Sequence, residues 1–341
     1  MKGSHATIGY VSFISRPPAS FNSAVIELLL EQGAVFYCKT NLPQSMMTAD
    51  SHNNVFGRTL NPHNLSVTAG GSTGGEGALL AMRGSILGMA TDIAGSCRIP
   101  AICCGITGFK PSAGRVPFGG GVAPGRPGSP GSIAVVLGPM GYSIRDAELV
   151  MRTICNSDPW KFDENVLGVP WRRVDPVSRP LRFGLIRGHP KRPIHPPIAR
   201  ALHSAVTKLK EKGHHVVLLD EEIPDLWDTS ILAWRFFLLD PKKTPLQILK
   251  EAGEPIVPSL AQSATVEEFK WEPSLDKLWD LNVERFKVVK KYHDLVVGNN
   301  LDAIVMPGYQ ATAVPHDTFG IPAVYTVLQN LLNVSSWQQK T

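Results

Sequence analysis

Cysteine is scarce and unpatterned in this sequence. There are 5 cysteines among 341 residues, and no two of them form a C-x-x-C pair. This scarcity argues against a disulfide framework and against a zinc site, and it favours reduced thiols inside a cell. The formal net charge is only +5 and the basic residues are scattered, which argues against nucleic-acid binding. No P-loop or dinucleotide-binding glycine motif occurs either, so no cofactor is expected.

Long apolar runs are also missing. None approaches the ~18 residues that a membrane-spanning helix needs. The first residues do not combine a basic segment with an apolar one, as a secretory signal would. We therefore expect a cytoplasmic protein without a membrane span.

What the sequence does contain is enough apolar material for a sizeable core. Hydrophobic residues make up 43% and charged residues 18%, which is too apolar for a disordered chain. No serine- and glycine-rich linker or block of charge divides the chain, so a single domain over 1–341 is expected.

The most informative stretch runs from Gly70 to Pro100 and reads GGSTGGEGALLAMRGSILGMATDIAGSCRIP. It holds two serines among small residues, Ser72 in GGSTGG and Ser96 in IAGSC. Small residues let backbone N–H groups turn toward one point. A serine at such a turn can be a nucleophile whose oxyanion hole comes from neighbouring N–H groups. By composition alone, however, a glycine-rich run with scattered serines is more typical of a turn or linker.

A second interpretation of the same glycines stays open. The pentapeptide GGSTG, Gly70–Gly74, fits the G-x-S-x-G nucleophile elbow of α/β-hydrolases, between a predicted strand and a predicted helix. It would make the protein an esterase with Ser72 as nucleophile and with Asp302 and His316 completing a triad.

Over its whole length, Gly70–Pro100 resembles the signature of the amidase signature family. The resemblance is strongest to the fungal acetamidase-like and fatty-acid-amide-hydrolase-like branch. The flanks Lys39–Asn64 and Gly105–Pro117 extend it, and Met306–Leu332 continues it more loosely. It implies an α/β fold with a mixed, mainly parallel sheet and helices on both faces. It also implies hydrolysis of a small carboxylic amide to an acid and ammonia or an amine.

The resemblance assigns roles by position. Ser96 matches the nucleophile, and Ser72 matches the bridging serine that follows a cis peptide and relays a proton. Asp92 and Arg98 match residues that support the nucleophile loop, and Thr73 stands where a second serine is common. The oxyanion hole corresponds to the backbone N–H groups of Ile93, Ala94, Gly95 and Ser96.

One family residue has no counterpart. The general base of the family is a lysine that precedes a segment resembling Lys2–Tyr10, and Lys2 itself matches a later family lysine. We therefore expect an amidase truncated at both ends, with a divergent tail at 333–341. Such a chain is expected to be weak or inactive, and a degenerate amidase retained only for binding stays open. So does a homodimer.

Hydrophobic periodicity outlines the elements. Segments 181–186, 197–212 and 214–219 predict a strand, a helix and a second strand, and hence a parallel β-α-β unit. Further strands are predicted at 34–38, 65–69, 86–91 and 302–306, and further helices at 21–32, 76–83, 144–155, 228–239 and 275–297.

Overall fold

The computed structural model describes residues 1–128 and 132–338. A four-stranded sheet in the order β11-β6-β7-β5 lies at its centre, and every neighbouring pair in it is antiparallel. The strands are β5 (Gly88–Asp92), β6 (Thr107–Lys110), β7 (Val136–Gly141) and β11 (Ser336–Gln338).

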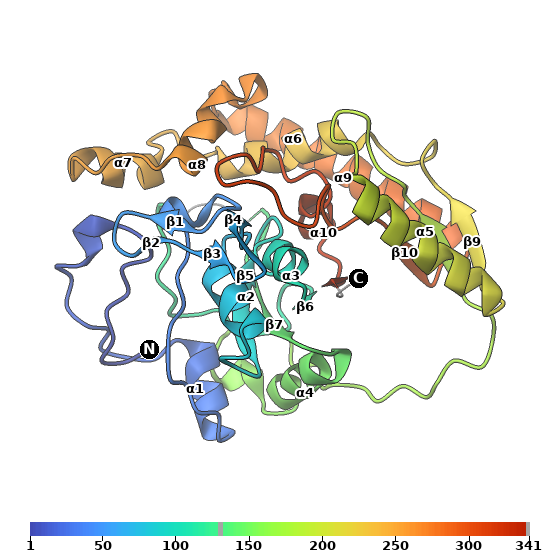
Figure 1. Ribbon diagram of the computed structural model, residues 1–341, viewed down its shortest axis with the longest axis horizontal. Helices are drawn as coiled ribbons and strands as arrows, with labels where there is room; N and C mark the ends of the chain where they lie inside the picture. The colour runs from blue at the N-terminus through green and yellow to red at the C-terminus, as the bar shows by residue number, and fades with distance from the viewer. Residues whose placement is uncertain (129–131, 339–341) are drawn as a thin grey trace.

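Helices cover both faces of this sheet (Figure 1). Side chains alternate along a strand, so adjacent residues serve opposite faces. Ala90 and Met140 pack with one pair of helices, whereas Met89 and Leu137 pack with the other pair. The first pair is α2 (Gly74–Ala81) and α3 (Arg98–Cys104), and the second is α1 (Ala24–Glu31) and α4 (Ile144–Cys155).

A second, smaller sheet has the order β10-β8-β9 and is parallel throughout. Helix α5 (Pro196–Glu211) connects β8 to β9, so the predicted β-α-β unit is confirmed. The strands are β8 (Arg182–Leu185), β9 (His215–Leu218) and β10 (Ala303–Val305).

Most of the remaining helices lie along one side of the molecule, whereas the last one lies nearer its centre (Figure 1). The largest apolar cluster contains residues of α6, α9 and α10 together with Ile186 and Leu219, which follow strands β8 and β9. The helices are α6 (Leu226–Phe237), α7 (Thr244–Glu251), α8 (Pro258–Ala261), α9 (Leu275–Gly298) and α10 (Val327–Leu331).

Short elements complete the fold. Strands β1 (His52–Asn53) and β2 (Gly57–Arg58) form one small hairpin, and β3 (Leu60–Asn61) and β4 (Asn64–Thr68) form another. Short 3-10 turns are found at Val11–Phe13, Gln44–Met46, Pro159–Lys161, Gln262–Thr265 and Glu267–Phe269.

The α/β class is confirmed, but two sequence predictions about strands are wrong. The expected mainly parallel sheet is instead antiparallel at its centre, because β7 lies between β5 and β6 and runs opposite to both. The predicted strand Ala34–Cys38 has no ladder partner in the described parts of the chain. Val35 is 86% exposed there, since an extended apolar segment becomes a strand only when a neighbour pairs with it.

Candidate active site

Ser72 and Ser96 lie on two turns that touch each other. Ser72 precedes α2 and is buried, whereas Ser96 lies between β5 and α3 and is partly exposed. The N–H of Thr73 donates to the carbonyl oxygen of Ser96 at 3.3 Å, which joins the two turns directly. The peptide bond between Gly71 and Ser72 is cis, as the resemblance implies.

The carboxylate of Asp92 organises the turn that carries Ser96. Its Oδ1 accepts from Gly95 N–H at 2.9 Å, and its Oδ2 accepts from Cys97 N–H at 3.2 Å. Arg98 donates to both oxygens, from Nε at 3.0 Å and from Nη2 at 2.9 Å. Both charged side chains are buried, with exposed fractions of 0% for Asp92 and 2% for Arg98.

The pKa of Asp92 reflects these contacts. Burial alone would raise this pKa, but the charge and hydrogen bonds of Arg98 outweigh burial and hold it below its ordinary value. Asp92 therefore stays ionised at neutral pH. An ionised carboxylate is needed here, because every neighbour just named is a donor.

Residues from the end of the chain brace the same turn. The Arg98 Nη2 also donates to Thr326 O at 2.8 Å and to Asn330 Oδ1 at 2.7 Å. The amide of Asn330 donates back to Asp92 O at 3.2 Å, and the Thr326 hydroxyl donates to Ala94 O. No sequence pattern predicts these contacts. The segment Met306–Leu332 carries only a looser resemblance to the family, and none of its residues indicates an interaction with Asp92.

Gly95 shows why this turn needs small residues. Its φ is +129°, which side-chain-bearing residues rarely adopt, and a Cβ there would lie 2.3 Å from the Thr326 hydroxyl oxygen. Its N–H is engaged by Asp92. Within the described residues, the N–H groups of Ile93, Ala94 and Ser96 have no hydrogen-bond acceptor, so they are available to a bound oxyanion.

Ser96 lines a small cavity of about 30 Å³. Its wall comes from distant parts of the chain: the 46–49 segment, the Ser96 turn, helix α6 and the 319–323 segment. Thr48 and Ser96 contribute the hydroxyl groups, and among the described residues no charged side chain lines it. The apolar wall is formed by Met46, Met47, Ala49, Ile93, Ala94, Ile99, Trp234, Phe319, Ile321 and Ala323.

Comparison with known proteins decides the family. The family model described as Amidase matches residues 1–340. The chain belongs to the amidase family. An amidase of Gibberella moniliformis is 35% identical over 338 residues, with 98% of this chain and 63% of that protein covered. An acetamidase of Aspergillus oryzae is 32% identical, with 96% and 62% covered. The chain thus spans a little under two thirds of these relatives.

Solved structures agree with this assignment. A structure titled fatty acid amide hydrolase superimposes on this chain with a TM-score of 0.91 and 34% sequence identity, covering 99% of this chain and 58% of that one. A bacterial aryl acylamidase superimposes with a TM-score of 0.77 at 23% identity, which shows the fold alone. The expected family and fold are therefore confirmed, whereas the individual site residues stay predictions.

The esterase triad is not assembled in this chain. Asp302 is paired with the Arg179 guanidinium and accepts from Arg182 N–H at 2.8 Å, at the start of β10. His316 instead contacts Leu65 O through Nε2 at 3.0 Å. Its Nδ1 lies 3.5 Å from an oxygen of Asp50. Because Asp302 and His316 have different partners, the sequence-based triad is wrong.

Other features bear on what the site can hold. Within residues 1–128 and 132–338, no side chain forms a hydrogen bond with the hydroxyl of Ser72 or Ser96. The Lys2 side chain is exposed. Among the described residues, no group of three or more histidines, cysteines and carboxylates could hold a metal ion. No helix in the same residues has the length and apolarity to cross a bilayer.

Proposed function

We propose that this amidase hydrolyses a carboxylic amide with a neutral, apolar acyl group, using Ser96 as nucleophile. The observation that carries the proposal is the position of Ser96: among the described residues, its cavity is lined by no charged side chain, and the turn that ends at Ser96 has three N–H groups without an acceptor. A charged acyl group would lose its hydration in this cavity and find no opposite charge, which is costly. The names of the relatives support amide hydrolysis as the reaction.

The first half of the reaction forms an acyl-enzyme. The Ser96 oxygen bonds to the carbonyl carbon, and the π electron pair of the carbonyl moves onto its oxygen. The N–H groups of Ile93, Ala94 and Ser96 stabilise that oxyanion, and removing one such donor costs about 3–4 kcal/mol in other hydrolases. The C–N bond then breaks as the oxyanion collapses. A water molecule later attacks the ester carbon and releases the acid.

Proton transfer is the role we propose for Ser72. As the bond to carbon forms, Ser72 takes the Ser96 proton while it passes its own hydroxyl proton to a base. The base then returns a proton through Ser72 to the departing nitrogen, which leaves as ammonia or an amine. Ser72 must be linked to a base, because a serine hydroxyl is nearly fully protonated at neutral pH. Since no described side chain bonds to the Ser72 hydroxyl, we expect slow turnover from these residues alone.

An active-site probe tests the nucleophile. A fluorophosphonate should label the wild-type protein on Ser96, as mapped by peptide mass spectrometry, and Ser96→Ala should remove the label. Ser66→Ala is the matched control, because Ser66 is an exposed serine outside the site. Labelling of Ser72, or undiminished labelling of Ser96→Ala, would contradict the assignment. A folded wild type that takes no label would support the non-catalytic alternative.

Substrate choice is tested with paired amides of similar length. Propanamide should be hydrolysed at least about tenfold more efficiently than malonamate, a primary amide of similar length with a terminal carboxylate, because the described residues around the cavity offer no partner for the charge. A preference for the charged amide would contradict the neutral, apolar acyl class.

The cytoplasmic location and the homodimer stay predictions.

A further inference from the structure

The Ser51 side chain contacts the turn that carries Ser72. The Ser51 side chain is fully buried, and its hydroxyl oxygen lies 3.0 Å from Gly70 O and 3.2 Å from Ser72 O. The same oxygen accepts from Gly74 N–H at 2.9 Å. A hydroxyl has one proton, so Ser51 donates to one of the two carbonyls while it accepts from Gly74. The contacts therefore reach both sides of Ser72.

The contact with Gly74 supplies a cap that the helix otherwise lacks. Gly74 is the first residue of α2, so its N–H has no acceptor within the helix. The preceding residue, Thr73, forms no side-chain cap. Ser51 thus caps α2 from another segment of the chain. A Cβ on Gly74 would lie 2.4 Å from the Ser51 oxygen, so only glycine permits this approach.

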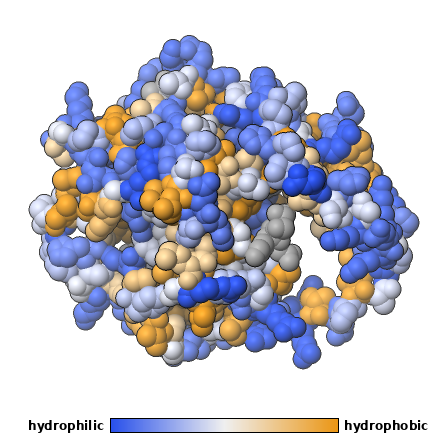
Figure 2. Space-filling view, viewed as in Figure 1, coloured by the Kyte–Doolittle hydropathy of each residue, from blue (hydrophilic) through white to orange (hydrophobic). Residues whose placement is uncertain are grey.

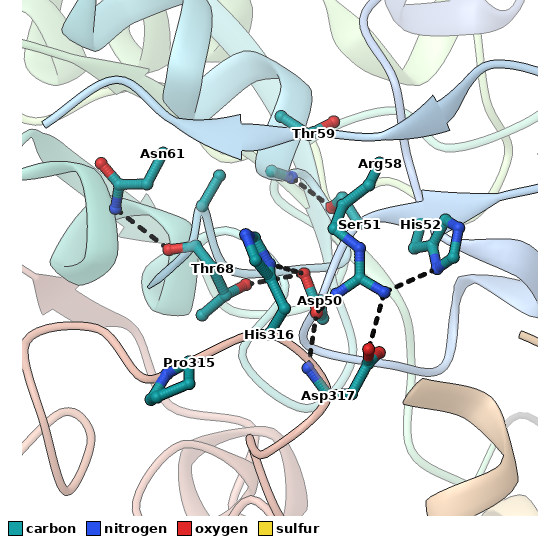
Figure 3. A network of polar contacts seen from close by, with 12 residues as sticks. Asp50, Ser51, His52, Arg58, Thr59, Asn61, Thr68, Pro315, His316 and Asp317 are labelled. Carbon is teal, nitrogen blue, oxygen red and sulfur yellow. Dashed lines mark hydrogen bonds and ion pairs between the residues drawn. The ribbon is translucent and has the colours of Figure 1, made fainter. Parts of the chain in front are cut away.

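A partly buried network of ion pairs and hydrogen bonds surrounds Asp50, the neighbour of Ser51 (Figure 3). Asp50 accepts from Arg58 Nη1 at 2.9 Å, from the Thr68 hydroxyl at 3.0 Å and from Asp317 N–H at 3.0 Å. Arg58 also donates to the Asp317 carboxylate at 2.7 Å. Because Asp50 is 1% exposed and bonded on several sides, the backbone at Ser51 has little freedom to move.

We propose that Ser51 is a positioning residue: its hydroxyl fixes the Gly70–Gly74 turn so that Ser72 is held against the Ser96 turn for proton transfer. The inference rests on the proposed function, in which Ser72 moves the proton. Ser51 touches neither the substrate cavity nor Ser96, so its effect on the reaction must pass through Ser72.

The test compares two substrates of the same acid, an anilide and a p-nitrophenyl ester. The amine needs a proton to leave and p-nitrophenolate does not, so misplacing Ser72 should slow the anilide more. Ser51→Ala should lower kcat for the anilide about 10- to 100-fold, with KM little changed and a smaller loss on the ester. Ser51→Cys, which keeps a weak donor and acceptor, should recover part of the anilide rate.

Two comparisons separate positioning from general loss of structure. Ser230→Ala is the matched control, because Ser230 is also fully buried and its hydroxyl donates only to Trp227 O, at 2.7 Å. It should leave the anilide-to-ester ratio unchanged. In the Ser72→Ala background, adding Ser51→Ala should change the anilide rate by less than about twofold, because both changes remove one function. Equal losses on both substrates, or additive losses in the double variant, overturn the proposal.

A readout independent of activity separates this inference from the proposed function. Hydrogen exchange of the Gly74 N–H should be slow in the wild type and in Ser230→Ala, and much faster in Ser51→Ala. A wild type that hydrolyses neither substrate overturns the proposed function, and Gly74 exchange then decides the contact alone. Unchanged Gly74 protection in Ser51→Ala overturns the positioning role. If Ser51→Ala does not fold, Ser51→Cys is judged by the same exchange and ratio criteria.

Discussion

Replacing Asp92 by asparagine should destabilise the protein and disable the Ser96 turn together. Oδ1 faces Gly95 N–H, an Arg98 nitrogen and the Asn330 amide, whereas Oδ2 faces Cys97 N–H and the second Arg98 nitrogen. In either orientation, an asparagine amide would point its NH₂ group at backbone and guanidinium donors. The Arg98 charge would also stay buried without its anion.

The expected magnitude follows from burial. Because Asp92 and Arg98 are 0% and 2% exposed, water cannot replace the lost contacts. Breaking a buried ion pair by removing one partner typically costs about 3–5 kcal/mol. The free energy of unfolding of Asp92→Asn should fall by that amount. The cost should be smaller at acidic pH, because the pKa of Asp92 is depressed in the fold: its stabilisation is complete above the ordinary pKa and disappears as pH falls through the folded value.

Urea unfolding at pH 7 and at about pH 2.5, well below the ordinary aspartate pKa of 3.8, followed by tryptophan fluorescence, measures both effects. Asp158→Asn is the matched control, because the Asp158 and Lys161 side chains form an ion pair in which each is 57% exposed, and such pairs contribute little. Fluorophosphonate labelling of Ser96 should slow in Asp92→Asn and not in Asp158→Asn. Equal stability of the two variants, with Ser96 labelled at the wild-type rate, would refute this account of the turn.

Three further predictions concern single residues. Gly95→Ala should lower the free energy of unfolding in urea by about 1–3 kcal/mol or more, since its Cβ would lie 2.3 Å from the Thr326 hydroxyl oxygen. Gly298→Ala is the control and should cost nothing, because no atom lies within 4 Å of a Cβ at that position. Equal losses of stability in the two variants would contradict the close packing at Gly95. Burial lowers the pKa of Lys110 to about 8 from its ordinary 10.5. Between pH 8 and pH 10.5 the unfolded chain therefore keeps the Lys110 proton that the folded chain has lost, and the free energy of unfolding should rise with pH over this range. In Lys110→Met, the urea midpoint should rise less with pH over the same range than it does in the wild type. An unchanged dependence on pH would contradict the assignment to Lys110. Cys38 is exposed whereas the other cysteines are buried, so a thiol reagent should titrate one thiol in the native protein and none in Cys38→Ser. Rapid reaction of a second native thiol would show that burial does not protect it.

Local patterns were enough to predict the longest helices. Helix Ile144–Cys155 was predicted with the bounds that the structure shows, because its apolar residues recur at helical spacing. The strand–helix–strand order around α5 also sufficed for the parallel sheet, since such a crossover leaves few alternatives. The prediction for residues 34–38 was wrong because their short apolar run is typical of a buried strand, but a strand also needs a pairing partner, which no local pattern supplies.

The candidate site was likewise predicted only in part from the sequence. The small-residue motifs around Ser72 and Ser96 were visible in the sequence, because turns with close backbone approach require glycine and serine wherever they occur. The sequence alone therefore determined which two turns to examine and which family they resemble. Only the tertiary structure decided what holds those turns. Ser51 under Ser72, and Thr326 and Asn330 around Asp92, come from distant segments, and their hydrogen bonds exist only once packing brings those segments together. Asp302 and His316 are the converse case: the sequence suggested that they meet, but each has other partners, because the order of residues along a chain does not fix which side chains come together.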